Sequence, residues 1–422
     1  MTERKERDEG KGRAGRSGRR EGVKLTRKIR RDMYRAFGPP TFPLFMAAGG
    51  WILKNIGPRT PFIRFARPDR FSYHLPPVKS RAYERFYRNI IDRGLGREWG
   101  PHAATIAVTH ECNASCVHCS AFRRSRDGSL TTGQWCEVVD QCADLGITDV
   151  IITGGEPLLH PDLDIIIRRI VENGCVADLF TNGYLLSEEN LERLSEAGCD
   201  TIFVSLDSPW AEEHDRLRGV PGLYQQAIAG IERAVSRGMA VGISTYMSRE
   251  KVQRGYHRHF LALCKRLGVR ELTVFDLVPT GRCIKQDELI LTDAEREAFR
   301  PIQEEQWKDF RGLRVCLMCH VNDHHIMGCF GVKWQIHITH NGFVTPCDFT
   351  PLHFGNVKEE PLRDIWHRMK VQPEYDRKTM TCRMQDASFR RKYIHKIPEG
   401  AELPFPIHLV DEEHRAAAGR AE

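Results

Sequence analysis

From residue 103 onward, segments typical of strands and helices alternate, and this alternation restricts the fold more than any other feature. We expect strands at 103–110, 147–153, 175–181, 200–208, 240–247 and 269–279. We expect helices at 131–146, 162–174, 187–198, 222–238 and 256–268, several with a capping residue at the start and glycine at the end. Six strands that alternate with helices predict a parallel α/β sheet with right-handed crossovers.

Unusual loops follow four of these expected strands. Their sequences are ECNASCVHCS at 111–120, GGEP at 154–157, TNG at 181–183 and SLDS at 205–208. In parallel α/β barrels the loops at the carboxyl ends of the strands share one rim, and that rim carries the chemistry. We therefore expect the four loops to meet in one site.

The first loop holds Cys112, Cys116 and Cys119 at the spacing C-x3-C-x2-C, without an obvious fourth partner nearby. Structural zinc sites usually bring four ligands in two pairs. A four-iron cluster normally uses four cysteines, so three thiolates leave one iron open. An open iron can chelate a small molecule and donate an electron to it. Zinc or another structural metal is the alternative, but it does not explain GGEP at the end of the next strand.

This combination resembles the radical S-adenosylmethionine (SAM) enzymes, in which C-x3-C-x2-C after a first strand precedes a strand that ends in GGEP. The resemblance covers residues 103–285 and implies a partial (βα)6 barrel of the TIM type. It also implies a [4Fe–4S] cluster whose fourth iron binds SAM. One electron then releases a 5′-deoxyadenosyl radical, which abstracts hydrogen from the substrate. His118 departs mildly from the family, because an aromatic residue often precedes the last cysteine.

The resemblance also implies the residues that hold the two cofactors. It assigns the cluster to the three thiolates of Cys112, Cys116 and Cys119. The expected contacts with SAM are Gly154, Gly155, Glu156, Asn182, Ser205 and Asp207. Glycine permits close approach of the backbone, and a glutamate can accept from the SAM ammonium.

The C-terminal region contains a second set of cysteines. Residues 315–396 include Cys329, an expected hairpin with Asn341-Gly342 at its turn, Cys347, the sequence FGNV, and Cys382. This pattern resembles the SPASM and twitch extensions of radical SAM enzymes, small α+β domains that hold auxiliary iron–sulfur clusters. Because the full SPASM run of cysteines is absent, we expect a single [4Fe–4S] cluster on these three cysteines. The fourth ligand is left open between Cys316, Cys319, an aspartate and a substrate atom.

The basic charge of the chain is concentrated at its N-terminus. Residues 1–36 contain 14 Lys or Arg and six Asp or Glu, so their charge of +8 exceeds the +7 of the whole chain. We expect this tail to be disordered, without sequence-specific binding of nucleic acid. Residues 37–102 should be helical, and the apolar stretch 42–57 is too short to span a bilayer. It is expected to pack as a helix, with a peripheral contact of residues 24–57 with an anionic membrane surface as the alternative.

The remaining segments complete the expected organisation. Residues 286–314 should form a connecting helix with a capping box at Thr292 and Glu295, and 397–422 a C-terminal tail. The charged start lacks the apolar segment of a secretory signal, and fourteen cysteines in a long chain suit reduced thiols. We therefore expect a cytoplasmic protein, and peripheral contact with a membrane is the alternative.

The sequence leaves the substrate open. We expect an enzyme that takes electrons from a flavodoxin- or ferredoxin-type donor and acts on a small molecule or a peptide. Residues 37–100 lack the pattern of a winged-helix leader-binding domain, which favours a small molecule over a ribosomal peptide. An iron–sulfur protein that binds SAM without catalysis is the alternative of another class.

Overall fold

The computed structural model describes residues 73–77, 80–122, 125, 128–310, 312–322, 328–377, 379 and 381–411. The basic tail, the stretch 42–57 and the end of the C-terminal tail therefore lie outside the described residues. In the described part of the chain, no helix combines the length and the apolarity that a membrane span requires.

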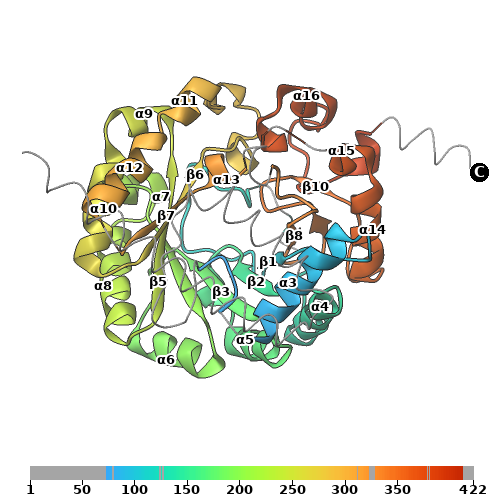
Figure 1. The fold of residues 1–422 in the computed structure, drawn as a ribbon, viewed down its shortest axis with the longest axis horizontal. Helices are drawn as coiled ribbons and strands as arrows, with labels where there is room; N and C mark the ends of the chain where they lie inside the picture. Colours follow the sequence, from blue (N-terminus) through green and yellow to red (C-terminus); the bar gives the residue numbers. More distant parts are fainter. Residues whose placement is uncertain are drawn as a thin grey trace, which may run out of the picture.

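Six parallel strands form the centre of the fold, as the sequence predicted (Figure 1). They are β1 (Ala103–Ala107), β2 (Asp149–Thr153), β3 (Val176–Thr181), β4 (Thr201–Ser205), β5 (Ala240–Met247) and β6 (Glu271–Asp276). Each strand pairs in parallel with the next along the chain. Helices cover the outside of the curved sheet, and its carboxyl ends carry the predicted loops.

The helices between the strands follow the expected pattern. They are α4 (Thr132–Asp144), α5 (Leu163–Glu172), α6 (Glu188–Ala197), α7 (Ala211–Arg218), α8 (Leu223–Ser236), α9 (Arg249–Gln253) and α10 (Tyr256–Leu267). Thr131 caps α4 in a capping box with Gln134, and Ser187 caps α6. Short 3-10 turns η1 (Pro157–Leu159), η2 (Gly281–Cys283) and η3 (Asp287–Leu289) follow β2 and β6. Helices α7 and α9 were not predicted.

The sheet extends beyond six strands at both edges. At one edge β7 (Arg314–Leu317) pairs in parallel with β6, and at the other β8 (Gln335–Ile338) pairs in parallel with β1. The predicted hairpin is present, because β8 pairs antiparallel with β9 (Val344–Thr345) across the Asn341-Gly342 turn. The strands of the C-terminal region are thus hydrogen-bonded to the barrel, which fixes that region against β1.

The structure divides the expected connecting helix into two separate helices. The capping box of Thr292 and Glu295 starts α11 (Asp293–Glu297), as predicted. A second helix, α12 (Arg300–Asp309), begins with Pro301 in its first turn. Proline lacks the N–H that would continue the ladder of the preceding turn, so the helical run is interrupted there.

The C-terminal region folds as short elements that pack beside β8 and α4. They are α13 (Met318–Val321), β10 (Leu352–His353), α14 (Leu362–Val371), α15 (Pro373–Asp376), η4 (Arg383–Gln385), α16 (Ala387–Phe389), the π-helix η5 (Arg390–Ile394), β11 (Phe405–Pro406) and η6 (Ile407–Leu409). Trp366 of α14 is fully buried and donates its indole N–H to the Val332 carbonyl at 3.2 Å. The two regions therefore share one continuous apolar core.

A segment that precedes α3 (Arg81–Gly94) closes the amino-terminal end of the barrel. The Tyr73 N–H donates to the buried Glu271 carboxylate at 2.8 Å, and the His74 ring stacks on Phe203 with centroids 5.0 Å apart. The same carboxylate pairs with the buried Arg314 of β7. This end of the barrel is filled with side chains, so the open end is the one that carries the four loops.

Candidate active site

The cysteine loop, residues 111–120, is fixed by the carboxyl end of α7. The Ser115 N–H donates to the Arg218 carbonyl at 2.9 Å, and the Val117 N–H donates to the Leu217 carbonyl at 3.0 Å. Carbonyls of the last helical turn have no partner inside the helix, so they are available to an outside donor. Helix α7 thus supplies acceptors that hold the backbone between Cys112 and Cys119.

The GGEP loop packs directly beneath the cysteine loop. The N–H groups of Gly155 and Glu156 donate to the carbonyls of Thr109 and Glu111, both at 2.7 Å. A Cβ on Gly155 would lie 2.1 Å from the Glu111 carbonyl oxygen, and one on Gly154 would lie 2.6 Å from that of Thr109. Glycine is therefore required at both positions because the two backbones lie too close together for a side chain. Approach of a ligand could add a second reason.

The Glu156 carboxylate is buried and joins GGEP to the TNG loop. It accepts from the Thr181 hydroxyl at 2.6 Å and from the Asn182 N–H at 2.8 Å. Burial raises the pKa of Glu156, and these donors oppose the rise. The Asn182 side chain in turn donates to the Asn113 side chain in the cysteine loop at 2.7 Å. Three of the four predicted loops are thus linked by hydrogen bonds.

The SLDS loop brings a buried ion pair to the same place. The Asp207 carboxylate accepts two hydrogen bonds from the Arg218 guanidinium, at 2.6 and 3.0 Å. Burial alone would raise the pKa of Asp207, but Arg218 holds it well below its usual range. Lys251 donates to the Asp207 carbonyl at 2.6 Å, and burial lowers the pKa of Lys251 to about 8. Ser205 ends β4, opposite Ser244 of β5.

The three thiols of the cysteine loop interact with one another and with this cation. Burial raises the pKa of Cys116 to about 11, and Arg218 opposes the rise more strongly than any other charge. The neighbouring Cys112 and Cys119 raise it further. Three cysteines on one loop beside a fixed guanidinium have the chemistry that an anionic iron–sulfur cluster requires, because the cation offsets the charge of the thiolates.

Sequence reasoning did not identify Arg218 or Lys251. Arg218 lies on α7, a short helix of largely polar sequence that the apolar periodicity did not reveal. Gly219, which ends that helix with φ +70°, was an available signal. His118 lies with its Nε2 atom 3.7 Å from an Asp207 oxygen, and burial lowers the pKa of His118 to about 4, so it is neutral at pH 7.

The predicted auxiliary cysteines, Cys329, Cys347 and Cys382, are all described in the C-terminal region, where each influences the pKa of another. The neighbouring Cys382 lowers the pKa of Cys329, and Arg383 lowers it further against the effect of burial. Burial raises the pKa of Cys347, and a negative charge on Cys329 adds to that rise. The hairpin and the η4 turn thus bring the charges of these cysteines within range of one another, although no three Cys, His, Asp or Glu side chains of the described residues are already arranged to hold a metal ion.

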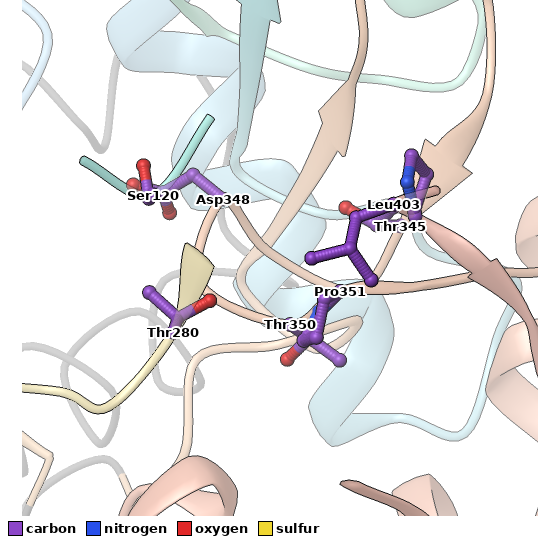
Figure 2. Close-up of a pocket in the computed structure, with 8 residues that line it drawn as sticks. Ser120, Thr280, Thr345, Asp348, Thr350, Pro351 and Leu403 are labelled. Carbon is purple, nitrogen blue, oxygen red and sulfur yellow. The ribbon is translucent and has the colours of Figure 1, made fainter. Parts of the chain in front are cut away.

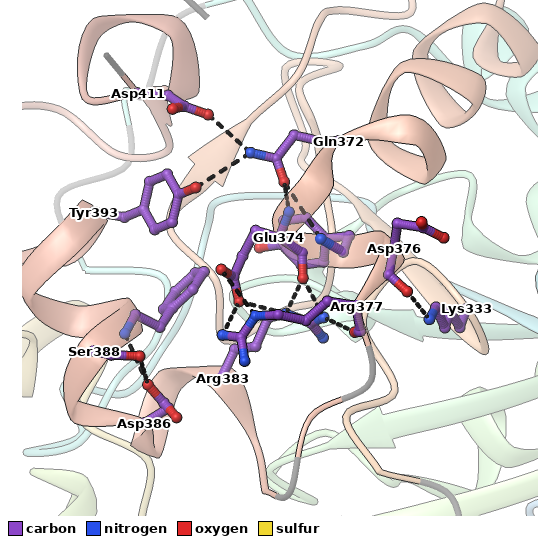
Figure 3. A network of polar contacts seen from close by, with 12 residues as sticks. Lys333, Gln372, Glu374, Asp376, Arg377, Arg383, Asp386, Ser388, Tyr393 and Asp411 are labelled. Atoms are coloured by element: carbon purple, nitrogen blue, oxygen red, sulfur yellow. Dashed lines mark hydrogen bonds and ion pairs between the residues drawn. The ribbon is translucent and has the colours of Figure 1, made fainter. Parts of the chain in front are cut away.

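A polar network orients the segment that carries Cys382 (Figure 3). The buried Arg383 guanidinium donates to the Glu374 carbonyl at 3.1 Å and to the Arg377 carbonyl at 2.8 Å. Gln372 donates to Asp411 at 2.8 Å and to the Tyr393 hydroxyl at 3.3 Å. The carbonyls hold Arg383 rigidly, so its positive charge stays beside Cys329.

The two candidates for a fourth auxiliary ligand have different surroundings. Cys316 lies on β7 opposite Thr273, and the charges that act on its thiol are those of Arg314 and Glu271. Cys319 lies on α13, which packs against β6. The carboxyl end of β6 reaches the auxiliary site, because Asp276 accepts from Gln385 and raises the pKa of Cys382.

A small polar cavity lies between the two cysteine sites (Figure 2). Ser120, which follows Cys119, lines one side, and Asp348, which follows Cys347, lines another. The other lining residues are Thr280, Thr345, Thr350, Pro351, Leu403 and Pro404. Residues next in sequence to Cys119 and Cys347 therefore line the same cavity.

Comparison with known proteins identifies the family. Residues 106–253 match the Radical SAM superfamily, and residues 329–392 match SPASM, an iron-sulfur cluster-binding domain. The AdoMet-dependent heme synthase of Methanosarcina barkeri is 32% identical over 295 residues, which cover 64% of this chain and 83% of that protein. The chain belongs to the radical SAM superfamily. It is a radical SAM enzyme with a C-terminal SPASM domain, and its cofactors are SAM and [4Fe–4S] clusters.

Other relatives within the superfamily have names that refer to peptides. The PqqA peptide cyclase of Gluconobacter oxydans is 28% identical over 63% of this chain and 76% of its own length. The solved structure of Streptococcus suis SuiB bound to its precursor peptide SuiA has a TM-score of 0.56 at 17% identity, over 79% of each chain. The structural likeness supports the barrel with its C-terminal extension, as predicted.

In a radical SAM enzyme the cluster and SAM together supply, when bound, hydrogen-atom abstraction from an unactivated C–H bond. The residues of this chain prepare the place for that chemistry. The end of α7 and the GGEP loop fix the cysteine loop, Asp207 orients Arg218 beside the thiols, and the segment at Tyr73 fills the opposite end of the barrel. The described contacts thus set the position of the cysteine loop and the charge beside it.

We predict that Gly155→Ala displaces the cysteine loop. A methyl group cannot occupy a point 2.1 Å from a backbone oxygen, so one of the two loops must move. The reconstituted variant should retain about four fewer irons per chain than the wild type in anaerobic iron analysis. Gly133→Ala is the matched control, because its Cβ would meet only Thr131 Oγ1 at 4.0 Å. Equal iron content in Gly155→Ala and the wild type would contradict the contact.

Proposed function

We propose that this enzyme binds its SAM-cleaving [4Fe–4S] cluster through Cys112, Cys116 and Cys119. The observation that carries the proposal is that the loop with these three cysteines is fixed by α7 and GGEP beside the Arg218 cation. The proposed contacts with SAM are Gly154, Gly155, Glu156, Asn182, Ser205 and Asp207. Because Glu156 and Asp207 already have buried protein partners, we infer that they act chiefly by holding the loops and Arg218 in place.

We further propose one auxiliary [4Fe–4S] cluster on Cys329, Cys347 and Cys382, with Cys319 as the fourth ligand. Cys319 is favoured over Cys316 because its helix packs on β6, whose end reaches Cys382. The auxiliary cluster binds the substrate or accepts an electron from it. The domain division that this implies is a core at 103–285 and an auxiliary domain at 315–396, joined through the shared sheet.

Iron analysis tests both assignments. Anaerobically reconstituted protein should contain close to eight irons and eight sulfides per chain, and the triple Ala variant of Cys112, Cys116 and Cys119 should keep about four. The triple Ala variant of the auxiliary cysteines should also keep about four. A wild-type value near four would remove the auxiliary cluster from the proposal.

For the substrate, we propose a small molecule of the tetrapyrrole class. The support is the heme synthase of Methanosarcina barkeri, at higher identity than the Gluconobacter peptide cyclase. The described residues before β1 form the barrel-closing segment and α3, and residues 37–100 lack the pattern of a leader-binding domain. Arg282, with its guanidinium 4.1 Å from the Phe122 ring centre, offers a cation beside the cysteine loop for a propionate group.

The experiment compares two substrate classes on reduced protein with SAM. A carboxylated tetrapyrrole should shift its visible absorption on binding and increase the formation of 5′-deoxyadenosine severalfold above the uncoupled rate. A ribosomal precursor peptide is the second candidate, favoured by the peptide cyclases. If only peptides increase the formation of 5′-deoxyadenosine, the substrate is a peptide and the tetrapyrrole proposal is rejected. No 5′-deoxyadenosine from any sample would leave a SAM-binding protein without catalysis.

We also propose two partners of the chain, an electron donor and an anionic membrane surface. The enzyme should accept electrons from a flavodoxin- or ferredoxin-type donor in the cytoplasm, and residues 24–57 should bind anionic membrane if they do not pack on the protein. Co-sedimentation with anionic liposomes should fall with salt and vanish when residues 1–57 are deleted. A full-length protein that ignores such liposomes at low salt would reject the membrane contact.

A further inference from the structure

The loop after β6 lies between the two cysteine sites and contacts both. We call residues 279–287 the bridge. On one side, the Arg282 N–H donates to the Cys119 carbonyl at 3.0 Å, and the Cys283 thiol donates to the Val117 carbonyl at 3.6 Å. A Cβ on Gly281, where φ is +49°, would lie 2.2 Å from the Cys119 oxygen. The bridge is thus in direct backbone contact with a proposed ligand of the SAM-binding cluster.

On its other side, the bridge is bonded to the segment that carries Cys347. The Thr280 hydroxyl donates to the Phe349 carbonyl at 2.7 Å, two residues after Cys347. Thr280 is buried and lines the small cavity of Figure 2. Because Thr280 and Cys283 are also joined by a hydrogen bond of 2.8 Å within the turn, the two contact surfaces belong to one rigid turn.

A buried arginine bonds the bridge to the segment that carries Cys382. Arg390 is fully buried at the start of the π-helix, and it donates to the carbonyls of Pro279 at 3.0 Å and Ile284 at 2.6 Å. The same guanidinium donates to the Met384 carbonyl at 3.1 Å, two residues after Cys382. Single-turn π-helices occur frequently at functional sites. The auxiliary segments are therefore bonded to both ends of the turn that meets Cys119.

We propose that the bridge couples the auxiliary site to the SAM-binding cluster, with Thr280 and Arg390 as positioning residues for Cys119. This inference rests on the proposed function of the two cysteine sets. A change at Cys347 or Cys382, such as loss of the auxiliary cluster, moves Phe349 or Met384 and, through the bridge, the backbone that carries Cys119. Thr280 and Arg390 donate to backbone carbonyls, so both residues would act through the backbone.

The test removes the Thr280 hydroxyl, which binds the auxiliary segment, and measures the effect on the SAM-binding cluster. Thr280→Val keeps the shape of the side chain and removes the donor to Phe349, whereas Thr280→Ser keeps the donor. In reduced protein with SAM, Thr280→Val should alter the electron paramagnetic resonance (EPR) signal of the SAM-binding cluster and speed its iron loss to a chelator severalfold. Thr280→Ser should match the wild type. Thr148→Val is the control, since Thr148 is equally buried but bonds His102 at the far end of the barrel.

A second variant separates coupling from local damage. The auxiliary triple variant, Cys329, Cys347 and Cys382 to Ala, leaves the bridge intact and should give the same altered EPR signal and faster iron loss as Thr280→Val. Should Thr280→Val fail to fold, this variant decides. Wild-type spectra and release rates in either folded variant would overturn the coupling. A wild type with fewer than eight irons, or without 5′-deoxyadenosine, would instead overturn the proposed function.

Discussion

Cys116→Ala should abolish SAM cleavage, with 5′-deoxyadenosine reduced to the background of the assay. Removing one of three thiolates destroys the set of ligands that leaves one iron open, and the remaining cluster becomes labile. Cys116 lies in the centre of the loop, flanked by the two N–H groups of Ser115 and Val117 that α7 binds. The backbone should therefore stay in place while the cluster is lost, and product analysis by chromatography measures the loss.

The control for this variant is Cys136→Ala. Cys136 is half-buried on α4, outside both cysteine sites, and its replacement should leave SAM cleavage at the wild-type rate. Normal product formation by Cys116→Ala would contradict the assignment of the cluster to this loop. The auxiliary iron, about four per chain, should remain in the variant and serves as an internal measure of folding.

Arg218→Met should destabilise the enzyme by about 3–5 kcal/mol at pH 7, because it leaves the Asp207 carboxylate buried without its partner. Asp207 is 2% exposed and Arg218 is 9% exposed, so water cannot replace the lost interaction. The variant should also lose cluster iron, since the cation beside Cys116 is removed. The melting temperature of the anaerobic holoenzyme and its iron content measure the two effects.

The destabilisation should depend on pH in a defined direction. In the wild type Arg218 lowers the pKa of Asp207, so the stability from this pair is present above about pH 3.9 and is lost as pH falls below it. In Arg218→Met, burial raises the pKa of Asp207 above its wild-type value because the strongest cation is lost, although His118 and Lys251 still lower it, and protonation at acid pH removes part of the penalty. The difference between wild type and variant should therefore shrink from pH 7 to pH 5.

Arg258→Met is the matched control, because Arg258 pairs with Glu305 on the exposed surface. Exposed pairs contribute at most about 1 kcal/mol, so this variant should melt close to the wild type. If Arg218→Met and Arg258→Met have the same melting temperature, the buried pair does not support the site. Its normal iron content would show that Arg218 has no part in holding the cysteine loop.

The sequence predicted the six core strands because each is a short apolar run, and burial of both faces of the sheet, against the outer helices and in the barrel interior, requires such runs. It also predicted a capping residue at the start of several helices, and the structure places these caps at Thr131 for α4, Ser187 for α6 and Thr292 for α11, where each accepts from an N–H group of the first turn. It did not predict the break before α12 or the strand β7, although Pro301 was a visible signal for the break.

By itself, the sequence determined the kind of chemistry, because the spacing of Cys112, Cys116 and Cys119 on one loop is a property of the chain alone. Tertiary structure decided what holds that loop. Arg218, Gly155 and Gly281 are separated from it by up to about 170 residues, and they meet it only after the parallel strands bring their carboxyl ends to one rim. No local pattern encodes such contacts, since they depend on which segments the curved sheet places side by side.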